Sequence, residues 1–154
     1  MTLFLAFAIG VIAGLRSMTA PAVTCWGAYL GWLRLQGSPL AFMGATVTTA
    51  LFSLFAIGEL IADKLPSMGS RLAAPGLSGR ILLGGLSGAT LAVSGEQSLL
   101  VGAVLGAFGG VVGAFGGYYS RRTLTKGFGL PDPPIALLED AIAIFGGLFI
   151  VSIS

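Results

Sequence analysis

Long apolar runs with few charges between them fill most of this sequence, and they constrain its fold more than any other feature. Charged residues make up 9% of the chain, whereas a soluble globular domain contains about 25%. The 8 basic and 6 acidic side chains cannot cover a water-facing surface for 154 residues. We therefore expect an all-α, polytopic bundle of transmembrane helices whose surface is covered mainly by hydrocarbon.

The apolar runs have the length of membrane spans, because a helix crosses a bilayer with roughly 20 apolar residues. Clear spans are predicted at residues 40–62, 81–94 with their flanks, 99–119 and 135–153. The chain is expected to form a single transmembrane domain with five to six helical pieces. Their approximate bounds are 3–15, 19–33, 40–63, 79–94, 98–120 and 134–152.

The first apolar segment, residues 3–33, is too long for one straight span, since such a helix would measure roughly 46 Å. Its centre contains Arg16 and Pro21. Proline removes a helix hydrogen bond and restricts the residue before it, so we expect a break near Arg16-Pro21. Two interpretations stay open: the segment crosses once with a kink, or it folds back as two short helices with Arg16 near the turn.

A folded-back first segment makes an inverted 3+3 repeat conceivable, with one half before and one half after the connection at residues 64–80. Its sequence support is one alignment, in which Gly10-x-x-x-Gly14 is laid over Gly84-x-x-x-Gly88. The structural precedent comes from transporters whose two halves have opposite orientations in the membrane.

Basic residues in the connections predict the orientation. One connection, at 64–80, carries Lys64, Arg71 and Arg80, and another, at 121–133, carries Arg121, Arg122 and Lys126. Two spans separate these connections, so both lie on one side of the membrane. The positive-inside rule makes that side cytoplasmic. At the helix end formed by Arg121 and Arg122, cations suit the helix dipole and can meet anionic lipid headgroups.

Acidic residues inside apolar helices indicate a polar site. Glu59 and Asp63 are four residues apart and share a helical face. Glu139 and Asp140 follow a predicted helix start at residues 132–134, and their side chains diverge by roughly 100°, so we expect that they cannot both face one partner. With Arg16 at a turn, all these groups reach the cytoplasmic half. The sequence therefore predicts a polar pocket, open or nearly open to the cytoplasm, that contains Arg16, Glu59, Asp63, Glu139 and Asp140.

A purely structural alternative gives these residues simpler roles. Asp63 and Lys64 would mark a helix end, and Arg16 and Glu139 would form one buried ion pair. Replacing a buried pair by apolar residues is often harmless to stability, so a fastening role is a weak reason to place charges in a membrane. Intramembrane ionisable residues favour a functional pocket instead.

Two glycine ladders indicate close helix packing between residues 98 and 120. Glycines spaced by four expose bare backbone, which lets a neighbouring helix approach. The ladders consist of Gly102, Gly106 and Gly110, and of Gly109, Gly113 and Gly117. Two ladders on different faces suit a central helix, so packing within the chain is favoured over a homo-oligomer seam.

The residues present also restrict the chemistry. The chain has no histidine and a single cysteine, Cys25, so we expect no metal site, no cofactor and no disulfide within the chain. It is not expected to be an enzyme, because acid–base work would fall to carboxylates, Lys64 or tyrosines without a supporting motif. The net charge of +2 gives no support for a nucleic-acid partner. The expected partners are membrane lipid and a small polar or anionic solute.

Three motifs together resemble the short bacterial members of the domain-of-unknown-function 4126 family of integral membrane proteins. They read Gly14-Leu-Arg-Ser-Met-Thr-Ala-Pro21, then Gly58-Glu-Leu-Ile-Ala-Asp-Lys-Leu-Pro66 followed by Ser70-Arg71, and Ala136-Leu-Leu-Glu-Asp-Ala-Ile-Ala-Ile144. The resemblance covers nearly the whole chain and implies a multi-pass protein of the bacterial cytoplasmic (inner) membrane. It implies no catalytic or binding role for any residue.

Two functions from different classes follow from these features. The charged pocket favours a small transporter-like or lipid- or solute-binding bundle, with the pocket toward the cytoplasmic side. The glycine ladders favour the alternative, a non-transporting membrane scaffold or assembly partner.

Overall fold

The structure is a computed structural model that describes residues 1–64 and 72–154, and within them all regular structure is helical. The six α-helices are α1 (Thr2–Leu15), α2 (Thr19–Tyr29), α3 (Thr46–Ala62), α4 (Ala74–Ser94), α5 (Leu99–Arg122) and α6 (Asp132–Ser152). A 3-10 turn, η1 (Ala41–Gly44), precedes α3, and a π-helical turn, η2 (Thr123–Gly127), follows α5. The predicted all-α bundle is confirmed. Arg71, assigned above to the 64–80 connection, lies outside the described residues, as do Pro66 and Ser70 of the second motif.

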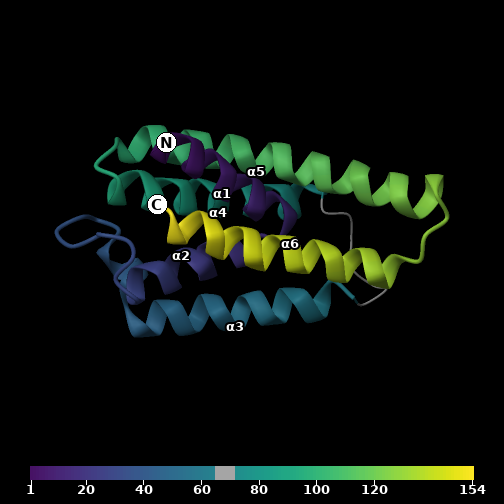
Figure 1. The fold of residues 1–154 in the computed structure, drawn as a ribbon, viewed down its shortest axis with the longest axis horizontal. Coiled ribbons are helices and arrows are strands. Elements are labelled where there is room, and N and C mark those ends of the chain that lie inside the picture. Colours follow the sequence, from purple (N-terminus) through teal and green to yellow (C-terminus); the bar gives the residue numbers. More distant parts are fainter. Residues whose placement is uncertain (65–71) are drawn as a thin grey trace.

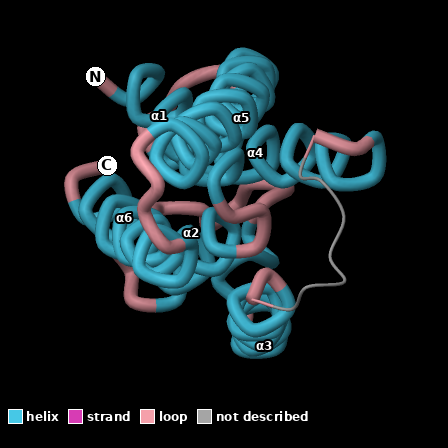
Figure 2. The backbone as a smooth tube through the Cα atoms, turned by 90° about the vertical axis from the view of Figure 1, so that its right-hand side faces the viewer, coloured by secondary structure: helices cyan, strands magenta, loops and turns pink. Residues whose placement is uncertain are grey.

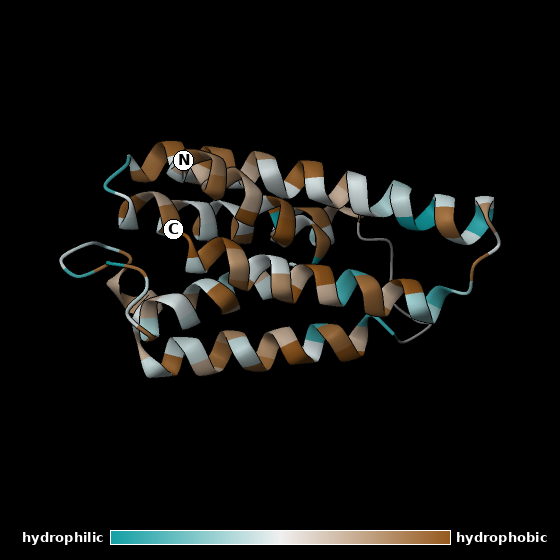
Figure 3. Ribbon diagram, viewed as in Figure 1, coloured by the Kyte–Doolittle hydropathy of each residue, from teal (hydrophilic) through white to brown (hydrophobic). Residues whose placement is uncertain are grey.

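Three helices of the described chain are long and apolar enough to cross a membrane: α4, α5 extended through η2, and α6. Apolar residues run along the helices, and hydrophilic ones gather toward their ends (Figure 3). The helix predicted at 40–62 begins later than expected. Residues 41–44 form η1, which leaves α3 with 17 residues, at the short end of the lengths that cross a bilayer.

Residues 3–33 fold back rather than cross once. Helix α1 ends where Arg16 adopts an extended backbone (φ −138°), and α2 then returns in the opposite direction (Figure 1). Contacts with α6 show the direction in which α1 runs. Ile12 of α1 lies beside Gly147 of α6, and Arg16, just after α1, pairs with Asp140, about two turns earlier in α6. Pro21 falls in the first turn of α2, where its missing N–H would have had no helical partner.

Helix α2 ends at Tyr29, four residues before its predicted end at 33. Gly31 has a φ of +82°, a left-handed conformation that glycine adopts without steric penalty. The backbone N–H of Trp32 donates to the Gly27 carbonyl (2.8 Å), and that of Gly31 donates to the Ala28 carbonyl (3.2 Å). These two bonds form the Schellman motif that stops a helix.

Successive helices alternate in direction, so the end of α3, the start of α4 and the α5–α6 connection lie at one end of the bundle (Figure 1). We call it the charged end, because Lys64 and Arg121 lie there. The α2–α3 and α4–α5 connections lie at the opposite end, where the Arg34 backbone N–H donates to the Ser94 hydroxyl (3.0 Å). The alternation agrees with an inverted repeat, but the packing does not, because α4 packs along α5 whereas α1 diverges from α2.

Helix α5 packs through its glycines against α1 and α4. A Cβ atom added at Gly10 or at Gly84 would overlap the backbone of Gly106, so α1 and α4 meet α5 at the same level. Gly102 and Gly110 face α4, and Gly109 and Gly113 face α1. Gly117 is buried as well. The aligned GxxxG motifs of α1 and α4 therefore share one contact point on α5.

Candidate functional site

Arg16 occupies the centre of the site, in the break between α1 and α2. Its side chain is fully buried, with 0% exposure. The guanidinium pairs with Asp63, which ends α3, and with Asp140 of α6. Its Nη2 atom also lies 4.0 Å from Glu139 Oε2. Three helices that are distant in sequence thus meet through one cation.

Asp140 is shared between two cations. One carboxylate oxygen faces Arg16, and the other lies 2.8 Å from Lys64 Nζ, which also donates to the Leu60 carbonyl (2.9 Å). The expectation that Glu139 and Asp140 cannot both face one partner is wrong in part. Although the two side chains diverge along α6, both carboxylates lie near the same Arg16 Nη2 atom, with Asp140 closer than Glu139.

Arg121 is also a site residue, although its sequence position indicates only a favourable contact with the helix dipole and lipid headgroups. Its Nε and Nη2 atoms donate to the two carboxylate oxygens of Asp132 (2.8 and 2.6 Å), a bidentate geometry that makes such pairs strong and specific. Its Nη1 atom lies 3.6 Å from Glu139 Oε2. The sequence contained a signal for the Arg121–Asp132 pair. Arg121 lies at the end of one predicted helix and Asp132 at the start of the next, and antiparallel neighbouring helices bring those two ends together.

Glu59 has a different role from the other predicted pocket residues. Its carboxylate accepts hydrogen bonds from the Ser17 N–H (2.9 Å), the Ser17 hydroxyl (2.6 Å) and the Met18 N–H (2.8 Å). These donors lie just before α2, where a helix has unpaired N–H groups and favours negative charge. Within the described chain Glu59 forms no ion pair with Arg16, so it fixes the turn rather than the cation.

Arg80 fixes the other side of the same break. It lies inside α4, only 6% exposed, and its Nε atom donates to the Gly14 carbonyl (2.9 Å) near the end of α1. The sequence predicts Arg80 in or beside a connection, because it predicts the start of α4 at residue 79. The helix begins at Ala74 with Pro75 in its first turn, a favourable position for proline that could have revealed the start.

A cavity of about 510 Å³ opens beside the ion pairs at the charged end. We call it the vestibule. It is lined by Asp63, Lys64, Arg121, Asp132, Pro133, Ala136 and Leu137. Arg16 is not among its lining residues, but Asp63 lines the vestibule and also pairs with Arg16. A molecule in the vestibule would therefore meet the partners of Arg16 before Arg16 itself.

Membrane-length apolar helices packed around a buried network of charges define a polytopic helical membrane protein. The chain belongs to the family described as Domain of unknown function (DUF4126), which matches residues 3–153. The resemblance of the three motifs to this family is thus confirmed. No curated protein and no solved structure matches the chain.

Proposed function

We propose that this protein is a small transporter-like membrane protein that binds a polar solute at the Arg16 network, through the vestibule at the charged end. We place it in the bacterial inner membrane, with the 64–80 and 121–133 connections in the cytoplasm. The observation that carries the proposal is the complete burial of Arg16 in a helix break, where acids from α3 and α6 hold its charge.

The energetics favour a role beyond fastening. An ionised side chain at mid-membrane costs roughly 2.5–3.5 kcal/mol on insertion scales. Replacing a buried ion pair by well-packed apolar residues is often neutral or stabilising. Broken helices at membrane depth are also where transporters expose backbone groups to solutes. The ends of α1 and α2 provide such a break beside Arg16.

The network offers two exchangeable contacts. An anionic group in the vestibule can replace Asp63 as the partner of Arg16, and a cationic group can replace Lys64 as a partner of Asp140. The Thr19 hydroxyl, at the start of α2, is buried and makes no hydrogen bond within the described chain. It is available to a bound solute. Each exchange keeps the buried Arg16 or Asp140 paired, and it releases Asp63 or Lys64, which are 20% and 43% exposed and line the vestibule.

Charge movement in proteoliposomes tests the proposal. Purified protein on a solid-supported membrane is challenged in turn with carboxylates, phosphates, amines and amino acids. We expect one of these classes to produce a current that Asp63→Asn abolishes and Lys64→Gln weakens. Glu96→Gln, at the opposite end, serves as the matched control and should behave as wild type. No current from any class, or an unchanged current in folded Asp63→Asn, would contradict the proposal.

Cysteine accessibility tests the proposed orientation. In a Cys25→Ala background, single cysteines at Gln36, Gln97 and Lys126 report three connections. We expect an impermeant maleimide added outside spheroplasts to label the first two positions, and to label Lys126→Cys only after lysis. The reverse pattern would place the vestibule on the outer side.

The alternative of a scaffold assembled through glycine ladders has less support. Its motivating residues on α5 contact α1 and α4 of the same chain. Filling those contacts with a second copy would require the bundle to open.

A further inference from the structure

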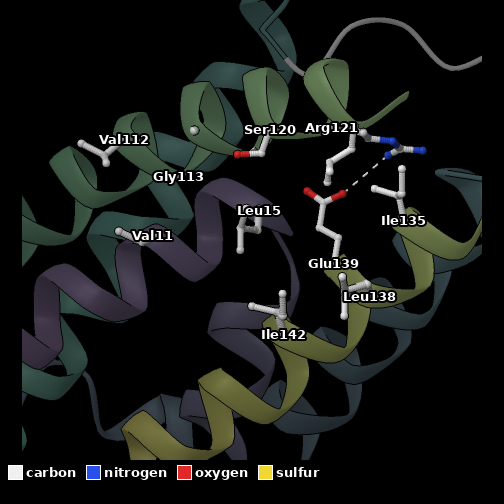
Figure 4. Close-up of a pocket in the computed structure, with 13 residues that line it drawn as sticks. Val11, Leu15, Val112, Gly113, Ser120, Arg121, Ile135, Leu138, Glu139 and Ile142 are labelled. Carbon is white, nitrogen blue, oxygen red and sulfur yellow. Dashed lines mark ion pairs between the residues drawn. The ribbon is translucent and has the colours of Figure 1, made fainter. Parts of the chain in front are cut away.

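A second cavity, of about 330 Å³, forms an apolar groove between α5 and α6. Its floor is α1, with Val11 and Leu15, and its walls carry Val112 of α5 and Ile142 of α6 (Figure 4). The volume lies near the lower end of the roughly 300–1,000 Å³ that is usual for small-molecule sites. The groove exists because glycines of α5 present no side chain there. A Cβ atom added at Gly116 would meet nothing within 4 Å.

The groove has one polar end. The Arg121–Glu139 ion pair spans it from α5 to α6, and Ser120 lies beside that pair (Figure 4). The Ser120 hydroxyl makes no hydrogen bond within the described chain. An apolar slot with a polar end has the polarity of an amphiphile, since a chain can lie in the slot while a headgroup meets the end.

A third cavity, of about 210 Å³, shares Arg121 with the groove and is strongly basic. It is lined by Tyr118, Arg121, Arg122, Thr125, Lys126 and Asp132. Asp132 is already bound by both arms of the Arg121 fork. Arg122 and Lys126 are exposed and form no ion pair with any residue that the structure describes. Two cations are therefore available to an anionic group.

We propose that the groove binds one acyl chain of an anionic phospholipid, whose phosphate lies against Arg122 and Lys126. Anionic headgroups are attracted to basic clusters at membrane surfaces, and the groove continues from that cluster past Arg121 into apolar surface. This site goes beyond the proposed function and does not rest on it. A solute can bind at Arg16 whether or not a lipid occupies the groove.

Native mass spectrometry of delipidated protein in detergent tests the chain-binding part. The probes are phosphatidylglycerol and phosphatidylcholine with identical acyl chains. Wild type is expected to bind one phosphatidylglycerol at least tenfold more tightly than phosphatidylcholine. Gly116→Leu places a side chain in the groove at a position where an added Cβ meets nothing within 4 Å, and it should lose that binding at least tenfold. Gly58→Leu, where an added Cβ also meets nothing within 4 Å, is the matched control and should bind as wild type.

The headgroup part is tested with Arg122→Ala/Lys126→Ala. Each cation near a membrane surface contributes about a fivefold factor, so phosphatidylglycerol should bind roughly 25-fold more weakly. Phosphatidylcholine binding and the Arg34→Ala control should not change. Millimolar inorganic phosphate should fail to displace the lipid, since it lacks the acyl chain. Equal affinity for the two lipids, unchanged binding to Gly116→Leu, or displacement by phosphate alone would overturn the proposal.

Discussion

Two regions of this bundle are held together in contrasting ways. Helices α1, α4 and α5 touch backbone to backbone, because glycines remove the side chains between them. The break before α2, the end of α3 and helix α6 meet through long charged side chains at the charged end. Helix α3 lies at the edge of the bundle and packs mainly on α2 and η1 (Figure 2). Many of its side chains are exposed.

The difference separates a rigid part from an adjustable part. Backbone contacts depend on dispersion at short range and tolerate no added atom. Ion pairs can exchange partners, and Asp140 already has two. The adjustable network lies where the opening helix breaks.

Removing the central cation should have the largest effect. Arg16→Met leaves the carboxylates of Asp63 and Asp140 without their buried partner, which should lower the free energy of unfolding by about 3–5 kcal/mol. Equilibrium unfolding in detergent measures the loss. The double variant Arg16→Met/Asp63→Asn removes one orphaned charge and should recover part of it. A double variant no more stable than the single one would show that charge is not what Arg16 supplies.

Adding one methyl group to the glycine contact should have the next largest effect. In Gly106→Ala the new Cβ overlaps backbone atoms of α4, which cannot rotate away as a side chain can. We expect a loss of up to about 3 kcal/mol. Gly58→Ala is the matched control. Its Cβ meets nothing, and the gain in helix propensity should stabilise by about 0.5–1 kcal/mol. Equal thermal shifts in the two variants would show that the glycine contact between α5 and α4 is not rigid.

Neutralising the helix cap should have a smaller effect. Glu59→Gln keeps the side-chain length but loses the negative charge that faces the N–H groups of Ser17 and Met18. We expect a loss of about 1–2 kcal/mol, as for other helix caps. Glu96→Gln, an exposed acid at the opposite end, should leave the melting temperature unchanged. If both variants melt as wild type, the turn between α1 and α2 does not depend on Glu59.

The sequence predicted the fold where a single strong signal was present. Apolar runs predicted the helices, and Arg16 with Pro21 predicted the break. Four residues that the sequence grouped with Glu59 in one pocket, namely Arg16, Asp63, Glu139 and Asp140, lie together in the structure. For residues 3–33 the sequence left open a kinked span and a hairpin of two helices. Both are compatible with Arg16 and Pro21, and they differ only in tertiary packing.

The parts that could not be predicted depend on where helices begin and on their contacts. Arg80 and Arg121 resemble ordinary flanking charges until the start of α4 and the antiparallel packing of α5 and α6 are known. Helix α3 was expected to be longer, because apolar residues continue through η1 and composition does not distinguish a 3-10 turn from a helix start. The separate role of Glu59 has no sequence signal, since its partners are backbone N–H groups 41 and 42 residues away.

The smallest expected effect concerns the rim of the adjustable region. Arg121→Lys keeps the charge but loses the bidentate fork to Asp132, whose side chain is 55% exposed. Solvent screens such a pair, so the loss should be about 0.5–1 kcal/mol. Thermal melting should show a shift of a few degrees that shrinks in high salt, and Arg34→Lys should show none. A shift as large as that of Arg16→Met would mean that Arg121 belongs to the buried centre of the network. The boundary between the buried network and its solvent-exposed rim would then lie farther out along α5.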